Sequence, residues 1–184
     1  TDWDYMVQRL AEEEPLWKPG TRNGYHMSTF GWTVGELVRR TSGLSLGDYF
    51  RTRVAEPLGL DFHIGLPESE HHRVSRILRW TPKKGELVSP YTVALMQSKE
   101  SLQYIALLNN GKFKTDAPES YLFQYGAGGG IANGKGMAGM FKPFANGGEG
   151  FVDKVGLARM QAASVITHED LTLVSPTKFS LGFM

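Results

Sequence analysis

The sequence predicts an α+β fold, because two kinds of segment occur along the chain. Apolar residues at helical spacing, bounded by capping residues, mark much of the sequence, and period-two alternation marks residues 179–184. A second short extended piece is expected over residues 62–67. We expect helices at residues 2–13, 33–42, 45–55, 137–145 and 153–166, and a helical or mixed segment at residues 88–108.

The first two helices have recognisable end signals. Either Thr1 or Asp2 can cap the free N–H groups of the first helix. In the second helix, Thr33 and Glu36 match the S/T-x-x-E capping box, and Gly43 is placed to end it. Both helices are therefore predicted from their ends as well as from their periodicity.

Proline and glycine set the limits of the later segments. Ser45 is a candidate cap for the third helix, and Pro57 is expected to stop that segment. Gly111 terminates the next helix, and Pro143 is expected to kink the one after it near its end. The polar and basic stretch 68–84 is expected to be an exposed connection.

Composition excludes several classes of function. Lys and Arg total 20 and Asp and Glu total 19, a formal net charge of +1, which gives no electrostatic case for a nucleic-acid partner. Because there is no cysteine, disulfides, thiolate catalysis and cysteine-based zinc sites are excluded. No apolar run approaches the roughly 20 residues that a membrane span needs. Residues 1–4 lack the features of a signal peptide, so localisation stays open between cytoplasm and export.

Glycines crowd residues 126–136, where Lys135 lies between Gly134 and Gly136. A phosphate-binding P-loop needs Ser or Thr after its lysine, where this chain has Gly136, and no apolar strand precedes the run. We therefore interpret the run as a flexible loop before a helix.

His71 and His72, with Glu68 and Glu70, come nearest to a metal-binding motif. Adjacent residues on a helix or a strand point apart, so a neighbouring pair is poorly placed to share one ion. We interpret this cluster, and likewise His168-Glu169-Asp170, as solvated charged segments, and no metal site is predicted.

Three short strings match catalytic motifs of serine β-lactamases. Ser175-Pro176-Thr177-Lys178 matches S-x-x-K, His63-Ile64-Gly65 matches H-x-G, and Lys114-Thr115-Asp116 matches K-T-G at its first two positions. The S-x-x-K chemistry needs both side chains on one helical turn, whereas Pro176 and the alternation after it favour a strand. We interpret all three as chance or structural matches, and keep a nucleophilic pair of Ser175 and Lys178 as an alternative.

A longer pattern runs from Pro19 to Trp32 and reads PGTRNGYHMSTFGW. It continues as GELVRR at residues 35–40 and EPLGL at residues 56–60. Here the chain resembles the serine β-lactamase-like hydrolase superfamily, which includes class C β-lactamases, DD-peptidases and related esterases. The pairing of Tyr25-His26 with a following Phe-Gly-Trp is more similar to the esterase-type branch.

The resemblance is high over residues 15–67, moderate over 126–184 and weak over 68–125. It implies a β-lactamase/transpeptidase-like α+β fold, of which this chain is mostly the helical part plus a piece of the antiparallel sheet. Residues 1–184 would form one partial domain: residues 1–125 are the mainly helical region with the tyrosine motif, and residues 126–184 return towards the sheet.

The resemblance also implies a carboxylesterase that cleaves short acyl esters through a seryl acyl-enzyme, with a small-molecule ester as its partner and no cofactor. Tyr25 is the catalytic position that can be carried over, sharing general acid and base work with the lysine of S-x-x-K; no substrate-binding residue is assigned. Met27 stands where the family has the Asn of Y-S-N. Because Met cannot donate a hydrogen bond to a substrate amide, it favours esters over β-lactams.

We expect the nucleophile motif upstream of Thr1 and the strand motif downstream of Met184, so the chain reads as an internal portion of a longer enzyme. The rival interpretation is a catalytically incomplete family member, or a fragment, that acts as a binding or structural module. Self-association through apolar surface is a further expectation.

Overall fold

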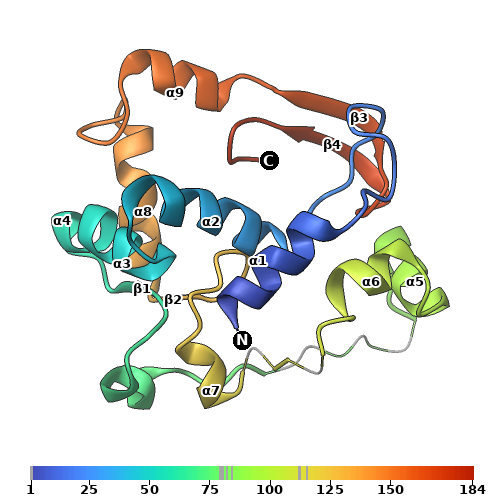
Figure 1. The fold of residues 1–184 in the computed structure, drawn as a ribbon, viewed down its shortest axis with the longest axis horizontal. Helices are drawn as coiled ribbons and strands as arrows, with labels where there is room; N and C mark the ends of the chain where they lie inside the picture. The colour runs from blue at the N-terminus through green and yellow to red at the C-terminus, as the bar shows by residue number, and fades with distance from the viewer. Residues whose placement is uncertain (1, 79–80, 82, 84, 112, 115) are drawn as a thin grey trace. The chain divides into compact units, whose positions relative to one another are not determined.

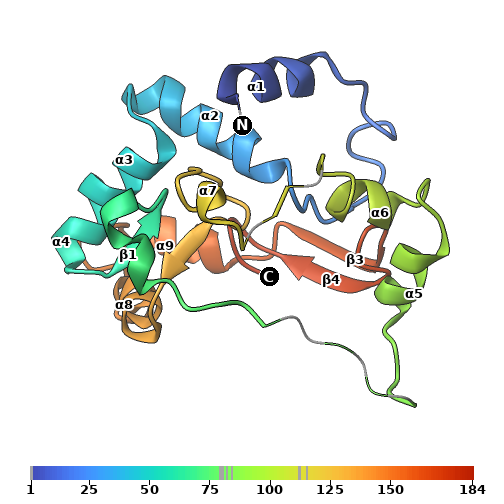
Figure 2. The same ribbon diagram turned by 90° about the horizontal axis from the view of Figure 1, so that it is seen from below.

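The computed structural model describes residues 2–78, 81, 83, 85–111, 113–114 and 116–184. The chain folds as two compact units, each assembled from three stretches of sequence (Figure 1 and Figure 2). Unit 1 comprises residues 1–13, 28–77 and 113–145. Unit 2 comprises residues 14–27, 78–112 and 146–184.

Unit 1 consists mainly of helices around one pair of short strands. Its elements are α1 (Trp3–Glu12), α2 (Phe30–Ser42), α3 (Leu46–Phe50), a π-helical turn (Arg51–Ala55), α4 (Glu56–Leu58), β1 (Phe62–Ile64), a 3-10 turn (Glu68–Arg73), α7 (Pro118–Tyr121), β2 (Gly130–Ala132) and α8 (Gly134–Ala145). β1 pairs antiparallel with β2, and Figure 1 shows α3, α4 and α8 gathered beside this pair. Phe62 is buried, and the centroid of its ring lies 4.8 Å from that of Phe50. This aromatic contact packs α3 against the strands.

A buried carboxylate ties α1 to α2. Glu36 Oε2 accepts a hydrogen bond from Trp3 Nε1 at 2.9 Å, and the two Glu36 oxygens pair with Arg39 Nε and Arg40 Nε, each at 2.7 Å. Gly35 lets the indole lie against the helix backbone, since a Cβ there would be 2.6 Å from Trp3 Cη2. These hydrogen bonds, the one from Arg39 above all, lower the pKa of the Glu36 carboxyl from 4.5 to about 2.

The predicted capping box at Thr33 and Glu36 is wrong. α2 begins at Phe30, so Thr33 lies in its first turn and donates from Oγ1 to Phe30 O at 3.0 Å. Glu36 is turned towards Trp3 instead of the helix N-terminus. The Glu36 carboxylate, which the local pattern assigned to a helix cap, therefore makes a tertiary contact with α1 instead.

The other end signals of the first two helices hold. Asp2 caps α1, since its Oδ1 accepts from Tyr5 N at 3.1 Å. Thr1, the other candidate cap, lies outside the described residues. Gly43 ends α2 with a left-handed φ of 74°, as predicted.

Pro57 does not stop the third helix where we expected. Ser45 caps α3 as predicted, but the helical path continues through the π turn and α4, and ends at Gly59 with φ 61°. Hydrogen bonding shifts to a spacing of five residues just before the proline, where Glu56 N donates to Arg51 O. Because Pro57 has no N–H, it can follow this wider turn without leaving a donor unpaired.

The glycine-rich run also differs from its interpretation as a loop. It contains β2, whose partner β1 lies far away in the sequence, so no local pattern reveals the pairing. α8 begins at Gly134, ahead of the expected Met137, because Asn133 Oδ1 accepts from Gly136 N at 2.7 Å. Pro143 lies inside α8 near its end, as predicted.

Unit 2 combines three helices with a β-hairpin. Its elements are α5 (Pro90–Gln97), α6 (Leu102–Leu107), α9 (Lys154–Gln161), β3 (Val165–Asp170) and β4 (Ser175–Phe179). β3 and β4 pair antiparallel with Val165 opposite Phe179, and the register shifts between Thr167 and Asp170. Figure 1 shows the two strands as neighbouring arrows that run side by side.

Three predicted elements of unit 2 are corrected. The segment expected to be helical or mixed at 88–108 contains two separate helices, because Ser101 Oγ accepts from Tyr104 N at 3.1 Å and so caps the start of the second. The helix expected at 153–166 ends at Gln161, and Ile166 belongs to β3. The strand expected at 179–184 lies earlier, at Ser175–Phe179.

Two further findings concern membrane crossing and the connection expected at residues 68–84. None of the helices in the described part of the chain is long and apolar enough to cross a membrane. Of the connection expected at 68–84, residues 68–73 form a 3-10 turn, while residues 79, 80, 82 and 84 lie outside the described residues.

The first prediction concerns acid stability. The folded-state pKa of Glu36 lies below its unfolded value, so the stabilisation is present above about pH 4.5 and is lost as the pH falls towards 2. We expect Glu36→Gln to lower the free energy of unfolding by about 1–2 kcal/mol at pH 7, and by much less at pH 3. Urea unfolding of both proteins at the two pH values measures this.

The matched control is Glu13→Gln, which changes an exposed carboxylate just after α1. It should alter the unfolding free energy little at either pH. A difference between wild type and Glu36→Gln that stayed constant from pH 7 to pH 3 would contradict the assigned role of Glu36.

Candidate functional site

Tyr25, the predicted catalytic residue, lies in unit 2 on the loop that follows α1. Within this loop, Trp17 Nε1 donates to Arg22 O at 3.2 Å. Gly24 is required here, since a Cβ would lie 2.8 Å from Trp17 Cη2. The loop therefore folds around its own tryptophan immediately before it reaches Tyr25.

A buried carboxylate on the hairpin holds the tyrosine loop in place. The side chain of Asp170, at the end of β3, is completely buried. Its Oδ1 accepts from Tyr25 N at 2.9 Å, and its Oδ2 accepts from Asn23 Nδ2 at 2.8 Å. Leu171 N donates to Asn23 O at 3.0 Å, so backbone and side chain both join the loop to the hairpin.

The same carboxylate shapes the turn between β3 and β4. Asp170 Oδ1 also accepts from Thr172 N and Leu173 N, each at 2.9 Å. The turn brings Val174 to φ 54°, a left-handed conformation that is costly for a β-branched residue. Val174 N donates to Asp170 O at 2.8 Å, which adds a further restraint on this strained turn.

The Tyr25 side chain is accessible although its backbone is fixed. Its ring stacks on Phe179, at the end of β4, with centroids 5.8 Å apart and planes 10° apart. The residue is 40% exposed. A phenol supported in this way can meet a ligand from solvent without rearrangement of the loop beneath it.

Two helices of unit 2 contact the same loop and turn. Tyr91 of α5 donates from its hydroxyl to Met27 Sδ at 3.5 Å, and burial raises the pKa of the Tyr91 phenol, which stays protonated at neutral pH. Gln103 of α6 donates from Nε2 to Leu171 O at 2.7 Å and to Thr172 O at 3.1 Å. Tyr25 and Met27 are thus both held from outside the loop.

Sequence reasoning missed Asp170, Asn23, Gln103 and Tyr91. Asp170 was interpreted as part of a solvated charged segment, yet it is the most buried of these side chains. The β-branched residues at 165–167 favour a strand, and this signal could have placed Asp170 beside a turn. Nothing local indicates the contacts of Gln103 or Tyr91.

Ser175 and Lys178 do not form the S-x-x-K arrangement. Both lie on β4, three residues apart, so their side chains point to opposite faces of the strand. The geometry contradicts the alternative in which Ser175 is a nucleophile activated by Lys178, because that needs both groups on one helical turn.

The remaining candidates lie in unit 1, and the histidines among them contact residues that are close to them in sequence. His63, of the H-x-G string, is on β1 with Nε2 3.3 Å from Asp61 Oδ1. His71 Nε2 lies 3.1 Å from Leu66 O, and His72 Nδ1 lies 2.9 Å from Ser69 O. Across the described stretches, no three His, Asp or Glu side chains group as metal ligands would. Thr115, the centre of the K-T-G-like string, lies outside the described residues.

The second prediction tests the buried carboxylate. Asp170→Asn replaces one acceptor oxygen by an NH₂ group where both carboxylate oxygens now accept hydrogen bonds, so we expect a loss of about 2–4 kcal/mol in unfolding free energy. Faster hydrogen exchange of the Tyr25 amide should accompany it, because its acceptor is weakened. Urea unfolding and exchange monitored by NMR measure the two effects.

The neighbouring Glu169→Gln is the control, because Glu169 is an exposed carboxylate next to Asp170 in sequence. It should leave both quantities nearly unchanged. If Asp170→Asn proved as stable as this control, Asp170 would not be the anchor of the tyrosine loop.

Comparisons with known proteins agree with this architecture. LipL, an esterase/beta-lactamase of Mycobacterium tuberculosis, is 27% identical over 188 residues, which cover 97% of this chain and 43% of LipL. A penicillin-binding protein homologue from Caulobacter crescentus matches with a TM-score of 0.79 and 30% identity, over 100% of this chain and 47% of that one. EstA from Arthrobacter nitroguajacolicus Rue61a matches with a TM-score of 0.80 and 27% identity, over 99% and 49%.

The chain therefore spans about half the length of the relatives it matches. The two structural likenesses confirm the predicted β-lactamase/transpeptidase-like α+β fold. The family described as Beta-lactamase matches residues 1–184, and the chain accordingly belongs to the beta-lactamase family.

Proposed function

We propose that Tyr25 is the proton-transfer residue of a hydrolase that cleaves small-molecule carboxylic esters through a seryl acyl-enzyme. The nucleophilic serine and its lysine are contributed from outside residues 1–184, which form a partial domain of the enzyme. The observation that carries the proposal is that Tyr25 combines a backbone fixed by Asp170 with an exposed fraction of 40% for the residue as a whole. The name of LipL, an esterase/beta-lactamase, supports the choice of ester substrates.

In the proposed reaction, the serine oxygen attacks the ester carbonyl carbon while the Tyr25 oxygen takes the serine proton. The carbon–oxygen bond to the alcohol then breaks, and the phenol of Tyr25 returns the proton to the leaving alkoxide. Water attacks the acyl-serine by the same proton transfers and releases the acid. A phenol with a pKa near 10 needs an adjacent cation to act as a base, which is the role of the lysine.

The surroundings of Tyr25 favour an ester over an amide. Met27, two residues along the loop, presents a thioether that cannot donate a hydrogen bond to an amide carbonyl. The Tyr91 hydroxyl lies against this sulfur. We propose that these two side chains give one wall of the site a mainly apolar character, suited to a short acyl chain.

The third prediction is the removal of the phenol. In the whole protein that contains this chain, Tyr25→Phe should lower kcat for p-nitrophenyl acetate by about 10²–10⁴-fold, because it removes the proton carrier and little of the packing. Steady-state kinetics measure the change, and the thermal midpoint should stay close to wild type.

Tyr49→Phe is the matched control, since Tyr49 is a partly exposed tyrosine on α3 of unit 1. It should retain wild-type kcat. A Tyr25→Phe enzyme that kept more than half of the wild-type kcat would refute the assignment of Tyr25.

The fourth prediction locates the nucleophile. A serine-acylating phosphonate should add one adduct to the whole protein, and peptide mapping should place it outside residues 1–184. Ser175→Ala should leave both the labelling and the ester turnover unchanged, because Ser175 and Lys178 lie on opposite faces of β4. An adduct on Ser175 would overturn this, and a protein that takes no adduct would instead support a binding or structural module.

A further inference from the structure

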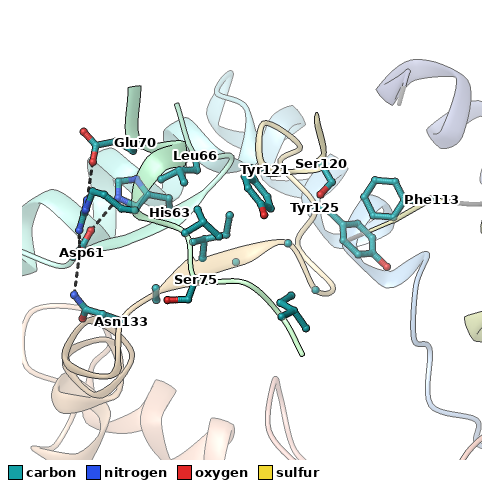
Figure 3. A pocket seen from close by; sticks show the side chains of 18 residues that line it. Asp61, His63, Leu66, Glu70, Ser75, Phe113, Ser120, Tyr121, Tyr125 and Asn133 are labelled. Atoms are coloured by element: carbon teal, nitrogen blue, oxygen red, sulfur yellow. Dashed lines mark hydrogen bonds and ion pairs between the residues drawn. The ribbon is translucent and has the colours of Figure 1, made fainter. Parts of the chain in front are cut away.

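A pocket of about 530 Å³ lies in unit 1 beside β1 and β2 (Figure 3). Figure 3 shows a polar end, where Asp61, His63 and Glu70 gather, and an aromatic end, where Phe113, Tyr121 and Tyr125 gather. All the residues that line it belong to unit 1, whereas Tyr25 belongs to unit 2. The pocket is therefore lined by a set of residues separate from the proposed catalytic loop.

The polar end contains two carboxylates, which share one arginine. Arg73 Nη1 pairs with Glu70 Oε2 at 2.7 Å, and Arg73 Nη2 pairs with Asp61. Asn133 Nδ2 also donates to Asp61 Oδ2, at 2.8 Å. The Arg73 guanidinium lowers the pKa of both carboxyls, so both are ionised at neutral pH. Two carboxylates against one guanidinium leave an excess of one carboxylate at this end of the pocket.

The aromatic end offers ring surface. Phe113 lies edge-on to Tyr125 with centroids 6.2 Å apart and planes at 67°. The Tyr121 hydroxyl donates a hydrogen bond to Asp116 O at 3.3 Å, and Tyr121 also lines the pocket. Aromatic faces attract other rings and also cations.

The glycine-rich run supplies a wall without side chains. A Cβ on Gly129 would lie 2.8 Å from Tyr125 O, and one on Gly130 would lie 2.9 Å from Phe62 Cε2. Glycine is thus needed at both positions for close packing. Both glycines also line the pocket.

We propose that this pocket binds a small molecule that has an aromatic body and a primary ammonium group. The ammonium would lie at Asp61 and Glu70, where the charge is negative, and the ring would lie among Phe113, Tyr121 and Tyr125. An anionic ligand of the same shape would meet the excess carboxylate and bind more weakly. The proposal involves no chemical step and does not depend on ester hydrolysis.

The fifth prediction uses three probes of one shape on the whole protein: 2-phenylethylammonium, the neutral 2-phenylethanol and the anionic 3-phenylpropionate. By isothermal titration calorimetry, the ammonium should bind about three- to tenfold more tightly than the alcohol, and the carboxylate should bind least. Raising the salt concentration should weaken only the preference for the ammonium.

Two variants and a control test where the ligand binds. Ser75→Trp puts a bulky side chain into the pocket from its lining and should abolish binding of the ammonium probe. Glu70→Gln keeps the shape and removes one charge, and should weaken binding about two- to fivefold. Glu68→Gln, an exposed carboxylate on the same 3-10 turn, should leave binding unchanged. Circular dichroism and thermal midpoints check that each variant folds.

Three results would overturn the proposal: no binding of the ammonium probe, equal or tighter binding of 3-phenylpropionate, or full binding to Ser75→Trp. Tyr25→Phe separates this proposal from the catalytic one. This variant should bind the ammonium probe as wild type does even though its ester turnover is strongly reduced. A loss of binding in this variant would show that the probe binds at the Tyr25 loop and not in the pocket.

Discussion

The arrangement around Tyr25 depends on one buried carboxylate. Moving a charged group out of water is expensive, and Asp170 meets this cost with hydrogen bonds from two backbone N–H groups of its own turn, one backbone N–H of the tyrosine loop and the amide of Asn23. The carboxylate thereby turns a surface loop into a fixed support. Gln103 extends the same network by binding the carbonyl groups of the turn, so a helix is attached to the hairpin as well.

Polar cross-links of this kind recur in both units. Glu36 joins two helices, Asp61 joins a strand, a 3-10 turn and the start of α8, and Asp170 joins a loop to a hairpin. The apolar core is small by comparison. Among the described residues, the buried aliphatic and aromatic side chains other than proline are Ala55, Phe62 and Leu66. Directional bonds thus join segments distant in sequence at several points within each unit.

Local signals predicted the helices with strong caps, and failed where a distant segment decided the outcome. Asp2, Ser45 and Gly43 act on their own neighbours, and the sequence was sufficient for them. Glu36 matched a capping pattern, but its carboxylate instead accepts a hydrogen bond from Trp3 of another helix. For the site, the resemblance pointed to Tyr25, but its supports could not be foreseen, because the partners of Asn23 and Met27 lie in segments of weak or moderate resemblance.

The separation of Asn23 from Asp170 by 147 residues has a consequence for biosynthesis. A chain emerging from the ribosome makes the tyrosine loop early and its anchor late, and both units interleave their segments. Unit 1 needs residues up to 145 and unit 2 needs residues up to 184, and contacts of such long range form slowly. The tyrosine loop therefore stays without its buried anchor until Asp170 has been made.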